Sequence, residues 1–296
     1  MLQDLKLDSV YSGFLFLAES ARNPPSLRSH RHVELELNLV ARGSITYVTG
    51  GGRFTFGPRS LLWMFPAQEH QLVDRTSDAQ NYVAVFKPEL IAKSCRQPTY
   101  AGLKRKKAED GKVLHTVLDP ETFGFLRRMM DHIMEGSLDP DLLNREAGFG
   151  VGSDFRYRHS DPDGLNAGLN HLLLSCWRLQ LAGTSPHRKI SLHPSVSKAI
   201  GILSDTEWTG TLAQLARECG MSQAHFSRMF ARQVGTPLNR YRNSLRLSRF
   251  LEHYRGDSQP TTLEAAFAAG FGSYAQFYKV FTDAYGQGPR RCFGKN

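Results

Sequence analysis

The spacing of apolar and polar residues in the first part of this chain is that of short strands. Up to about residue 86, runs rich in β-branched and aromatic residues alternate with clusters of Gly, Pro, Asn and Asp. Such runs are typical of strands joined by tight turns, and many of them at near-regular spacing indicate a small sandwich or barrel. We therefore predict a hairpin turn at 50–52 and strands over 11–17, 33–40, 45–49, 53–56, 61–65 and 82–86.

From Pro120 onward the apolar period becomes helical. One stripe runs to Glu135 and consists of Phe123, Leu126, Met130, Ile133 and Met134. A second stripe, at spacings of four and three, consists of Leu165, Leu169, Leu172, Cys176 and Leu179. Two heptads do not identify a coiled coil, so this stripe belongs either to the intramolecular core or to a dimer seam. Residues 148–164 are expected to form a loop, and residues 184–194 a linker.

The last third of the chain contains the same pattern twice. Six residues recur 51 positions later with the same or a similar side chain: Ser222, Ala224, Phe226, Arg228, Phe230 and Gly235 match Ser273, Ala275, Phe277, Lys279, Phe281 and Gly286. Each copy predicts a helix ended by a glycine, then a second helix capped by a serine. A duplicated helix-turn-helix with a basic second helix is suited to the DNA major groove.

The outward faces of the two second helices are the predicted DNA contacts. They present small and polar residues beside one cation each: Gln223, Ala224, Ser227 and Arg228 in the first copy, and Tyr274, Ala275, Tyr278 and Lys279 in the second. Between the copies, residues 237–254 predict a helix about 27 Å long. Successive major-groove faces are roughly 34 Å apart, so one chain is expected to reach two turns of a duplex.

Charge and composition support this division. The chain has 296 residues, which favours two domains, and its net charge is +9. Residues 190–296 carry 13 basic and 7 acidic side chains, so the positive excess accompanies the repeated motif, as phosphate binding requires. Four cysteines lack metal-site spacing and fit reduced thiols. With neither a long apolar run nor a recognisable signal peptide, we expect a cytoplasmic protein without a membrane partner.

Residues 196–293 resemble the DNA-binding domain of the AraC/XylS transcriptional regulators. The similar segments are Leu215–Ser222, His225–Phe230, Tyr241–Leu247, Gly270–Phe271, Phe277–Phe281 and Gly286–Pro289. The resemblance implies base contacts from Ala224, Ser227, Arg228, Tyr274, Ala275 and Lys279. Ser273 stands where this family usually has Asp, and Lys279 where it usually has Arg. Lys lacks the bidentate fork of Arg, so we expect the first unit to supply most of the base specificity.

The N-terminal part also carries a resemblance. His30, His32 and Glu36, followed by Pro66 and His70, resemble the two cupin motifs, whose β-barrel is the sensor domain of many such regulators. By period 2, His30, His32, Glu34, Glu36 and Asn38 share one strand face, opposite an apolar one. Aromatic walls for a small-molecule pocket are expected at Tyr47, Trp63 and Phe65. The resemblance to metal-dependent cupins implies His30, His32, Glu36 and His70 as a ligand set, and a metal-free effector pocket or a structural role are the alternatives.

Together these features predict an α+β protein with an N-terminal cupin-like β-barrel, a helical segment and an all-α domain with two helix-turn-helix units. The predicted segments are 1–118 for effector sensing, 119–186 for linkage and dimerisation, and 187–296 for DNA binding. The expected function is transcriptional regulation, as an activator, with promoter DNA, a small-molecule effector, RNA polymerase and a second copy of the chain as partners. We expect neither enzymatic activity nor a firm cofactor. The rival hypotheses are a metal-dependent cupin enzyme with a nucleic-acid tether, and a non-specific nucleoid protein.

Overall fold

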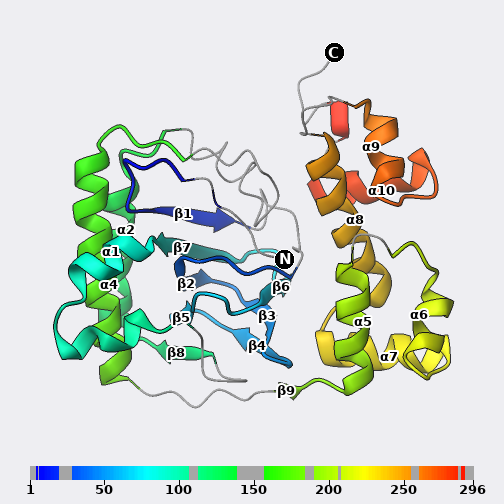
Figure 1. Cartoon of the computed structure of the whole chain (residues 1–296), viewed down its shortest axis with the longest axis horizontal. Coiled ribbons are helices and arrows are strands. Elements are labelled where there is room, and N and C mark those ends of the chain that lie inside the picture. Colours follow the sequence, from blue (N-terminus) through cyan, green and yellow to red (C-terminus); the bar gives the residue numbers. More distant parts are fainter. Residues whose placement is uncertain are drawn as a thin grey trace.

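Two antiparallel sheets form the N-terminal part of the protein, and helices form the rest (Figure 1). The structure is a computed structural model, and it describes residues 5, 7–19, 29–106, 113–138, 157–183, 190–205, 208–254, 260–285 and 288–290. The first sheet has the order β1 (Gly13–Glu19), β7 (Gln80–Phe86), β2 (Leu35–Arg42), β5 (Ser60–Met64) and β8 (Leu114–Val117). The second has the order β6 (His70–Arg75), β3 (Ile45–Thr49), β4 (Gly52–Phe56) and β9 (Ile190–Ser191).

The six strands expected from the sequence are present, each within two residues of its predicted start or end. The hairpin between β3 and β4 is also as expected, because Gly50 and Gly51 both have positive φ (53° and 68°), as a tight two-residue turn requires. The sheets face each other across a core that Tyr47 and Phe56 enter from the second sheet. Three strands were not predicted. β6 carries polar residues on both faces, β8 has four residues and β9 has two.

Two long helices cover the outer face of the first sheet (Figure 1). They are α2 (Pro120–Met134) and α4 (Pro162–Ala182), and shorter segments, α1 (Pro88–Ser94) and the 3-10 helix η1 (Pro98–Lys104), precede them. The stripe whose role the sequence left open is buried inside this layer, since Leu165, Leu169, Leu172 and Cys176 are at most 1% exposed. It is therefore part of the intramolecular core.

The structure differs from the predicted loop over 148–164 in the last residues of that range. Residues 148–156 lie outside the described part of the chain, but Pro162–Gly164 form the first turn of α4. The Asp161 carboxylate accepts a hydrogen bond from the Gly164 backbone nitrogen (2.9 Å) and caps this turn. An Asp N-cap followed by Pro is a favourable helix start, and this signal outweighs the glycine and charge content on which the loop prediction rested.

The C-terminal part consists of helices. Those over 212–218 and 238–254 end within one residue of the predicted ends, whereas the helix over 194–204 was not predicted. The helices have the following bounds. They are α5 (Pro194–Ser204), α6 (Leu212–Glu218), α7 (Gln223–Val234), α8 (Leu238–Tyr254), α9 (Thr262–Ala268) and α10 (Tyr274–Tyr285). Thr211 and Thr261 form capping boxes at the starts of α6 and α9. Phe226 and Phe230 are fully buried in the first unit, as are Phe277 and Phe281 in the second. This is the interior that the repeat predicted.

The two parts of the molecule pack against each other through the second sheet. Val48 and Val73 belong to the same buried cluster as α5, α6 and α7. β9, which lies within the predicted segment 187–296, extends the second sheet by pairing with β4. The hydroxyl of Tyr241 in α8 donates a hydrogen bond to the side chain of Gln71 in β6. The helix-turn-helix units are thus attached to the sensor part by buried side chains as well as by the connecting chain.

Candidate nucleic-acid interface and ligand site

The two helix-turn-helix units have closely similar local geometry. In each, the glycine after the first helix has positive φ, 73° at Gly220 and 86° at Gly270. The following residue then returns a backbone hydrogen bond to the first helix, from Met221 to Ala216 (2.9 Å) and from Phe271 to Ala266 (3.1 Å). These bonds satisfy carbonyls that a helix end leaves free. Both second helices therefore leave their turns in the same direction relative to the first.

The serine caps and the outward faces lie as the sequence predicted. Ser222 and Ser273 each accept a hydrogen bond from the backbone three residues on, at 3.4 and 3.2 Å. Among the predicted DNA contacts, six are exposed: Gln223, Ala224, Arg228, Ala275, Tyr278 and Lys279. Ser227 and Tyr274 are half-buried, and the Tyr274 ring lies 5.7 Å from the ring of Phe277. These six side chains are thus open to solvent on both second helices.

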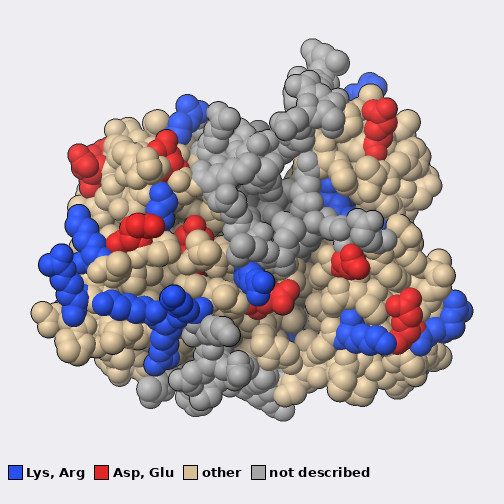
Figure 2. Space-filling view, viewed as in Figure 1, with Lys and Arg blue, Asp and Glu red and all other residues tan. Residues whose placement is uncertain are grey.

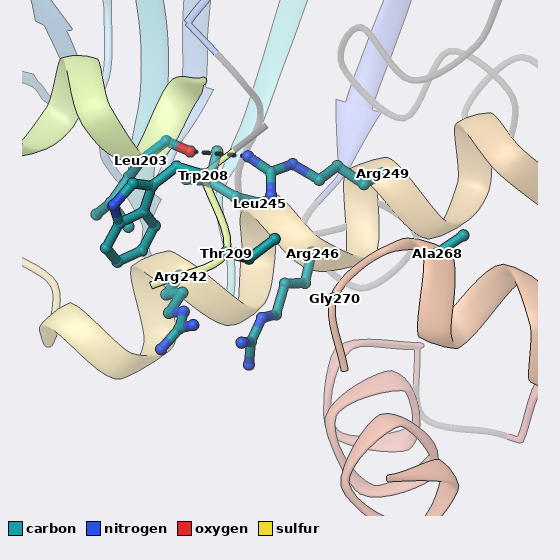
Figure 3. A pocket seen from close by; sticks show the side chains of 9 residues that line it. All are labelled: Leu203, Trp208, Thr209, Arg242, Leu245, Arg246, Arg249, Ala268 and Gly270. Carbon is teal, nitrogen blue, oxygen red and sulfur yellow. Dashed lines mark hydrogen bonds between the residues drawn. The ribbon is translucent and has the colours of Figure 1, made fainter. Parts of the chain in front are cut away.

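Helix α8 joins the units and carries three arginines on one side (Figure 3). Arg242, Arg246 and Arg249 line a small crevice of about 70 Å³ between the first and second units. Arg242 donates to the Gly210 carbonyl oxygen (2.7 Å) and Arg249 to that of Leu203 (3.1 Å), so they hold the end of α5 and the segment before α6 against α8. Three of the four arginines on this helix therefore gather on one side.

Arg246 lies between the other two and has a different environment. Its guanidinium carbon lies 5.8 Å from the centre of the Phe271 ring, a cation–π distance. Burial lowers its pKa to about 10, and the neighbouring charges of Arg242 and Arg249 act in the same direction. The middle of α8 thus presents concentrated positive charge at the junction of the two units, which is favourable for DNA phosphate.

The polar residues expected in the sensor part form one cluster between the sheets. We call His30, His32, Glu36 and His70 the His–Glu cluster. The His32 Nε2 atom lies 3.2 Å from a Glu36 carboxylate oxygen, and His70 Nε2 lies 3.7 Å from the same oxygen. The His30 and His70 rings are 4.3 Å apart. His32, Glu36 and His70 are buried, and His30 is half-buried.

Two asparagines and Tyr47 extend this cluster across the interior. Asn38 donates to the second Glu36 oxygen (2.7 Å), and its own oxygen accepts from Asn81 (3.0 Å) and from the Tyr47 hydroxyl (3.4 Å). Tyr47, which was predicted as a pocket wall, is thus part of the polar interior. Asn81 was not predicted as a site residue. Its signal in the sequence is an amide next to the apolar run 82–86, on a strand paired with β2.

Trp63 lies away from the cluster. On β5 its position pairs with Leu37, whereas the adjacent Met64 pairs with Glu36. Since successive strand residues point to opposite faces, Trp63 faces the covering helices. Its ring contacts that of Trp177 in α4, with centres 5.6 Å apart. The structure therefore corrects the expectation that Trp63 borders the same pocket as the histidines.

Within the His–Glu cluster, opposite charges favour the ionised forms of their neighbours. Burial alone would lower the pKa of His32, but the hydrogen bond and negative charge of Glu36, with the charge of Glu34, outweigh burial and raise this pKa. Burial would raise the pKa of Glu36, but His32 and His70 hold it well below its usual range. At neutral pH the carboxylate of Glu36 is therefore ionised and acts as an acceptor for cationic or donating groups.

The cluster also has the donor set of a metal site. One nitrogen each from His30, His32 and His70 lie within 4.8 Å of one another. The Nε2 atom of His70 is buried and has no hydrogen-bond partner among the described residues. Three imidazoles with a neighbouring carboxylate are ligands that Fe, Mn, Ni or Zn accept, so the residues present fit such a group. They equally fit a polar ligand that offers hydrogen-bond donors and acceptors.

Comparison with known families assigns the chain. The model of the AraC-like ligand binding domain matches residues 15–147, and the model of a helix-turn-helix domain matches residues 215–294. The two matches together span well over half of the chain, in the expected order. The chain belongs to the AraC/XylS family. This AraC-family protein is a DNA-binding transcriptional regulator with an effector-binding N-terminal domain.

Solved structures resemble this AraC-family chain over nearly its whole length, at low identity. ToxT from Vibrio cholerae is 12% identical in its apo form, with 95% of this chain and 97% of that one covered and a TM-score of 0.35. ToxT with an unsaturated fatty acid bound is 11% identical, with coverages of 95% and 94% and a TM-score of 0.33. The AraC-like transcriptional activator CuxR is 14% identical, with coverages of 89% and 83% and a TM-score of 0.34. The overall superpositions are loose, so the family assignment rests on the two domain matches.

Proposed function

We propose that α7 and α10 of this regulator read adjacent major grooves of its operator, and that an effector bound at the His–Glu cluster changes that binding. Strand β6 is the observation that carries the proposal. Its first residue, His70, belongs to the cluster, and the next, Gln71, accepts the hydrogen bond from Tyr241 of α8. Two residues after Gln71, on the same face, Val73 packs in the core of the first helix-turn-helix unit. A displacement of β6 would therefore move the side chains of Gln71 and Val73, which contact the DNA-binding part.

The proposed mechanism is a shift between two arrangements of the domains. An effector changes the population only if it binds one arrangement more tightly than the other. A ligand that hydrogen-bonds to Glu36 and His70 competes with the contacts that hold β6 in its present position. Leu72 of β6 belongs to the same buried hydrophobic cluster as Phe277 and Phe281 of α10, so the cores of both helix-turn-helix units include a residue of this strand.

Base specificity is proposed to come mainly from the first unit, because the planar guanidinium of Arg matches guanine O6 and N7 with a fixed fork that Lys lacks. The test is a pair of substitutions measured against operator and non-operator DNA in a gel shift. Arg228→Ala should lower operator affinity about tenfold to a hundredfold and reduce the preference for operator. Lys279→Ala should weaken binding to both DNAs by similar factors. The matched control is Arg96→Ala after α1, an exposed arginine of the sensor part, which should change neither affinity.

The opposite ranking would contradict this assignment. If Arg228→Ala left affinity and preference unchanged while Lys279→Ala abolished both, the second unit would be the reader. Equal competition by any unlabelled duplex against wild-type protein would instead favour the non-specific nucleoid protein.

A metal is the second candidate for the His–Glu cluster, favoured by the converging nitrogens of His30, His32 and His70. When bound, a divalent ion there would supply Lewis-acid character, and Glu36 would add negative charge to its ligands. Metal analysis of untagged protein tests this, and less than about 0.1 equivalent of metal after gentle purification would overturn the metal hypothesis.

We propose that the protein is not an enzyme. Oxygen consumption on adding iron would support the rival cupin enzyme.

We further propose that the regulator is a homodimer that acts in the cytoplasm and activates transcription through contact with RNA polymerase. In the described part of the chain, no helix is both long enough and apolar enough to cross a bilayer.

The dimer contact is proposed on the outer groove between α2 and α4, which is lined by Phe125 and Leu179. Phe125 is 51% exposed, and a large apolar side chain in a surface groove favours a protein contact. Phe125→Glu should convert the dimer to monomer in sedimentation analysis, whereas exposed Arg127→Glu should not.

A further inference from the structure

A second cavity lies on the sensor domain and is distinct from the interior of the sheets. We call it the α1 groove. It measures about 610 Å³ and lies between α1, the end of η1 and the turn after β5. Its walls are mainly apolar, formed by Val33, Pro66, Pro88, Ile91, Ala92 and Leu103. This volume and this lining are typical of sites for small organic molecules.

One side of the α1 groove is strongly basic. The consecutive residues Lys104, Arg105 and Lys106 line it, and no Asp or Glu is among the described residues that do so. Figure 2 shows Lys and Arg side chains gathered over α1 and the segment after it. A groove with apolar walls and a side lined by basic residues is complementary to a molecule with an apolar body and a negative head group.

The apolar wall is unusual for surface that faces only water. Val33, in the bend before β2, is 54% exposed, although Leu35, Leu37 and Leu39 of β2 are fully buried. Covering Val33 and the exposed side of Ala92 would remove apolar surface from water, which is favourable at roughly 25 cal/mol per Å². A negative head group would at the same time lie near the basic side chains of Lys104 and Lys106.

The α1 groove meets the His–Glu cluster at one residue. His32 lines the groove and also lies 3.2 Å from Glu36. A ligand in the groove therefore contacts a side chain whose other neighbours lead, through Glu36 and His70, to β6.

We propose that the α1 groove binds an anionic amphiphile, a monocarboxylate with an apolar body, for which decanoate is the probe. The head group lies against Lys104, Arg105 and Lys106, and the body lies along Val33, Ile91 and Leu103. The proposal that the groove binds such a molecule depends on these contacts alone. Its influence on DNA binding rests on the function proposed above, because it requires the route through His32 and β6.

The binding test uses full-length protein, decanoate and its neutral counterpart decanol, measured by titration calorimetry at low salt. Decanoate should bind at least tenfold more tightly than decanol, and added salt should reduce the difference. Lys104→Gln/Lys106→Gln should weaken decanoate about tenfold and leave decanol unchanged. The matched control is Lys93→Gln/Arg96→Gln, which removes two exposed cations of the same segment outside the groove and should change neither ligand.

A third variant tests the apolar part. Ala92 is exposed and lines the groove, so Ala92→Trp should fill it and abolish binding of both ligands without unfolding the domain. The proposal is overturned if decanoate and decanol bind equally, if the control pair weakens decanoate as much as the groove pair, or if Ala92→Trp has no effect. Normal secondary structure by circular dichroism confirms that each variant is folded.

A gel shift with operator DNA separates this proposal from the previous one. Operator binding that persists while decanoate fails to bind overturns the groove and leaves the DNA-binding function standing. Decanoate binding with no operator recognition overturns the DNA-binding function and leaves the groove standing. A decanoate-dependent change in operator affinity that is lost in Lys104→Gln/Lys106→Gln supports both.

Discussion

Glu36 is the residue on which the polar interior of the sensor domain depends. It accepts hydrogen bonds from His32 and Asn38, and it lies 3.7 Å from His70 Nε2. A buried carboxylate is stable only when such partners replace water. Removal of one partner leaves the charge partly uncompensated, so substitutions here are expected to be costly.

The pKa shifts predict how this cost depends on pH. The pKa of His32 is raised, so its contribution to stability is complete below about pH 6.5 and is lost as pH rises through the folded-state value. The pKa of Glu36 is depressed, so its contribution is present above about pH 4.5 and is lost as pH falls through its folded-state value. The pair therefore stabilises the fold most between these two limits.

We expect His32→Asn to lower the free energy of unfolding by about 3 kcal/mol at pH 5.5. The loss should be smaller at pH 8.5, where the wild-type imidazole has given up part of its charge. Urea unfolding with EDTA present, followed by tryptophan fluorescence, measures both values, and the other histidines cancel in the comparison. Equal losses at the two pH values would show that the His32–Glu36 pair is not ionic.

At the residue scale, the sequence predicted which polar side chains gather but not all of their neighbours. Alternation along 30–38 placed His32, Glu36 and Asn38 on one face, and they do share a cluster. This alternation could not exclude Trp63, which lies on the other face because Met64 is the residue that pairs with Glu36. That pairing depends on strand register, which the sequence of a single strand does not contain. Asn81 was missed for the same reason.

At the scale of elements, the turn glycines of the helix-turn-helix units are the most constrained positions. Gly220 has φ of 73°, a conformation that L side chains rarely adopt, although the space around it is open. Gly201 offers a matched comparison within α5, because its φ is ordinary and a Cβ atom there would have no neighbour within 4 Å among the described residues. Backbone conformation alone therefore distinguishes the two sites.

We expect Gly220→Ala to destabilise the DNA-binding domain by roughly 1–2 kcal/mol. Gly201→Ala should stabilise it by roughly 0.5–1 kcal/mol, because alanine restricts the unfolded chain and favours the helix. Chemical denaturation followed by helical circular dichroism compares the two. A change of the same sign in both variants would contradict the left-handed conformation at Gly220.

The sequence pattern predicted some helices and strands better than others. Helices α6, α7 and α10 carry regular apolar stripes, Ser or Thr caps and, after α6 and α7, positive-φ glycines, so both their type and their ends were predicted. Strand β6 was missed because both of its faces are buried, one by the cluster and one by the DNA-binding domain. A strand with polar residues on both faces has no alternation to detect. Its identity depends on the partners that it meets in the folded molecule.

At the scale of the whole molecule, the contact between Tyr241 and Gln71 joins the sensor and DNA-binding domains. Both side chains are buried, and burial raises the pKa of the Tyr241 hydroxyl far above its usual value. Arg53 of β4 adds a second polar contact, to the Arg232 carbonyl oxygen in the last turn of α7 (3.3 Å). A cation at the carboxyl end of a helix also interacts favourably with the helix dipole.

A double-mutant cycle tests the strength of this connection. Gln71→Leu should cost about 1–3 kcal/mol, because it leaves the Tyr241 hydroxyl buried without an acceptor. Adding Tyr241→Phe should restore about 1 kcal/mol of that loss, since both members of the pair are then apolar. Unfolding free energies of the four proteins give the coupling. Additive losses would mean that the two side chains do not interact in solution.

The alternation of β6 has a consequence for the engineering of hybrid regulators. Exchanging the DNA-binding half for that of a relative replaces Tyr241 and the surface against which Val73 packs. Under the mechanism proposed above, such a chimera would still bind its effector, because the histidines and Glu36 remain, but effector binding would no longer change the affinity of the new domain for DNA. Transplanting Gln71 and Val73 together with the helix they face, as one module, is the way to preserve an inducible output.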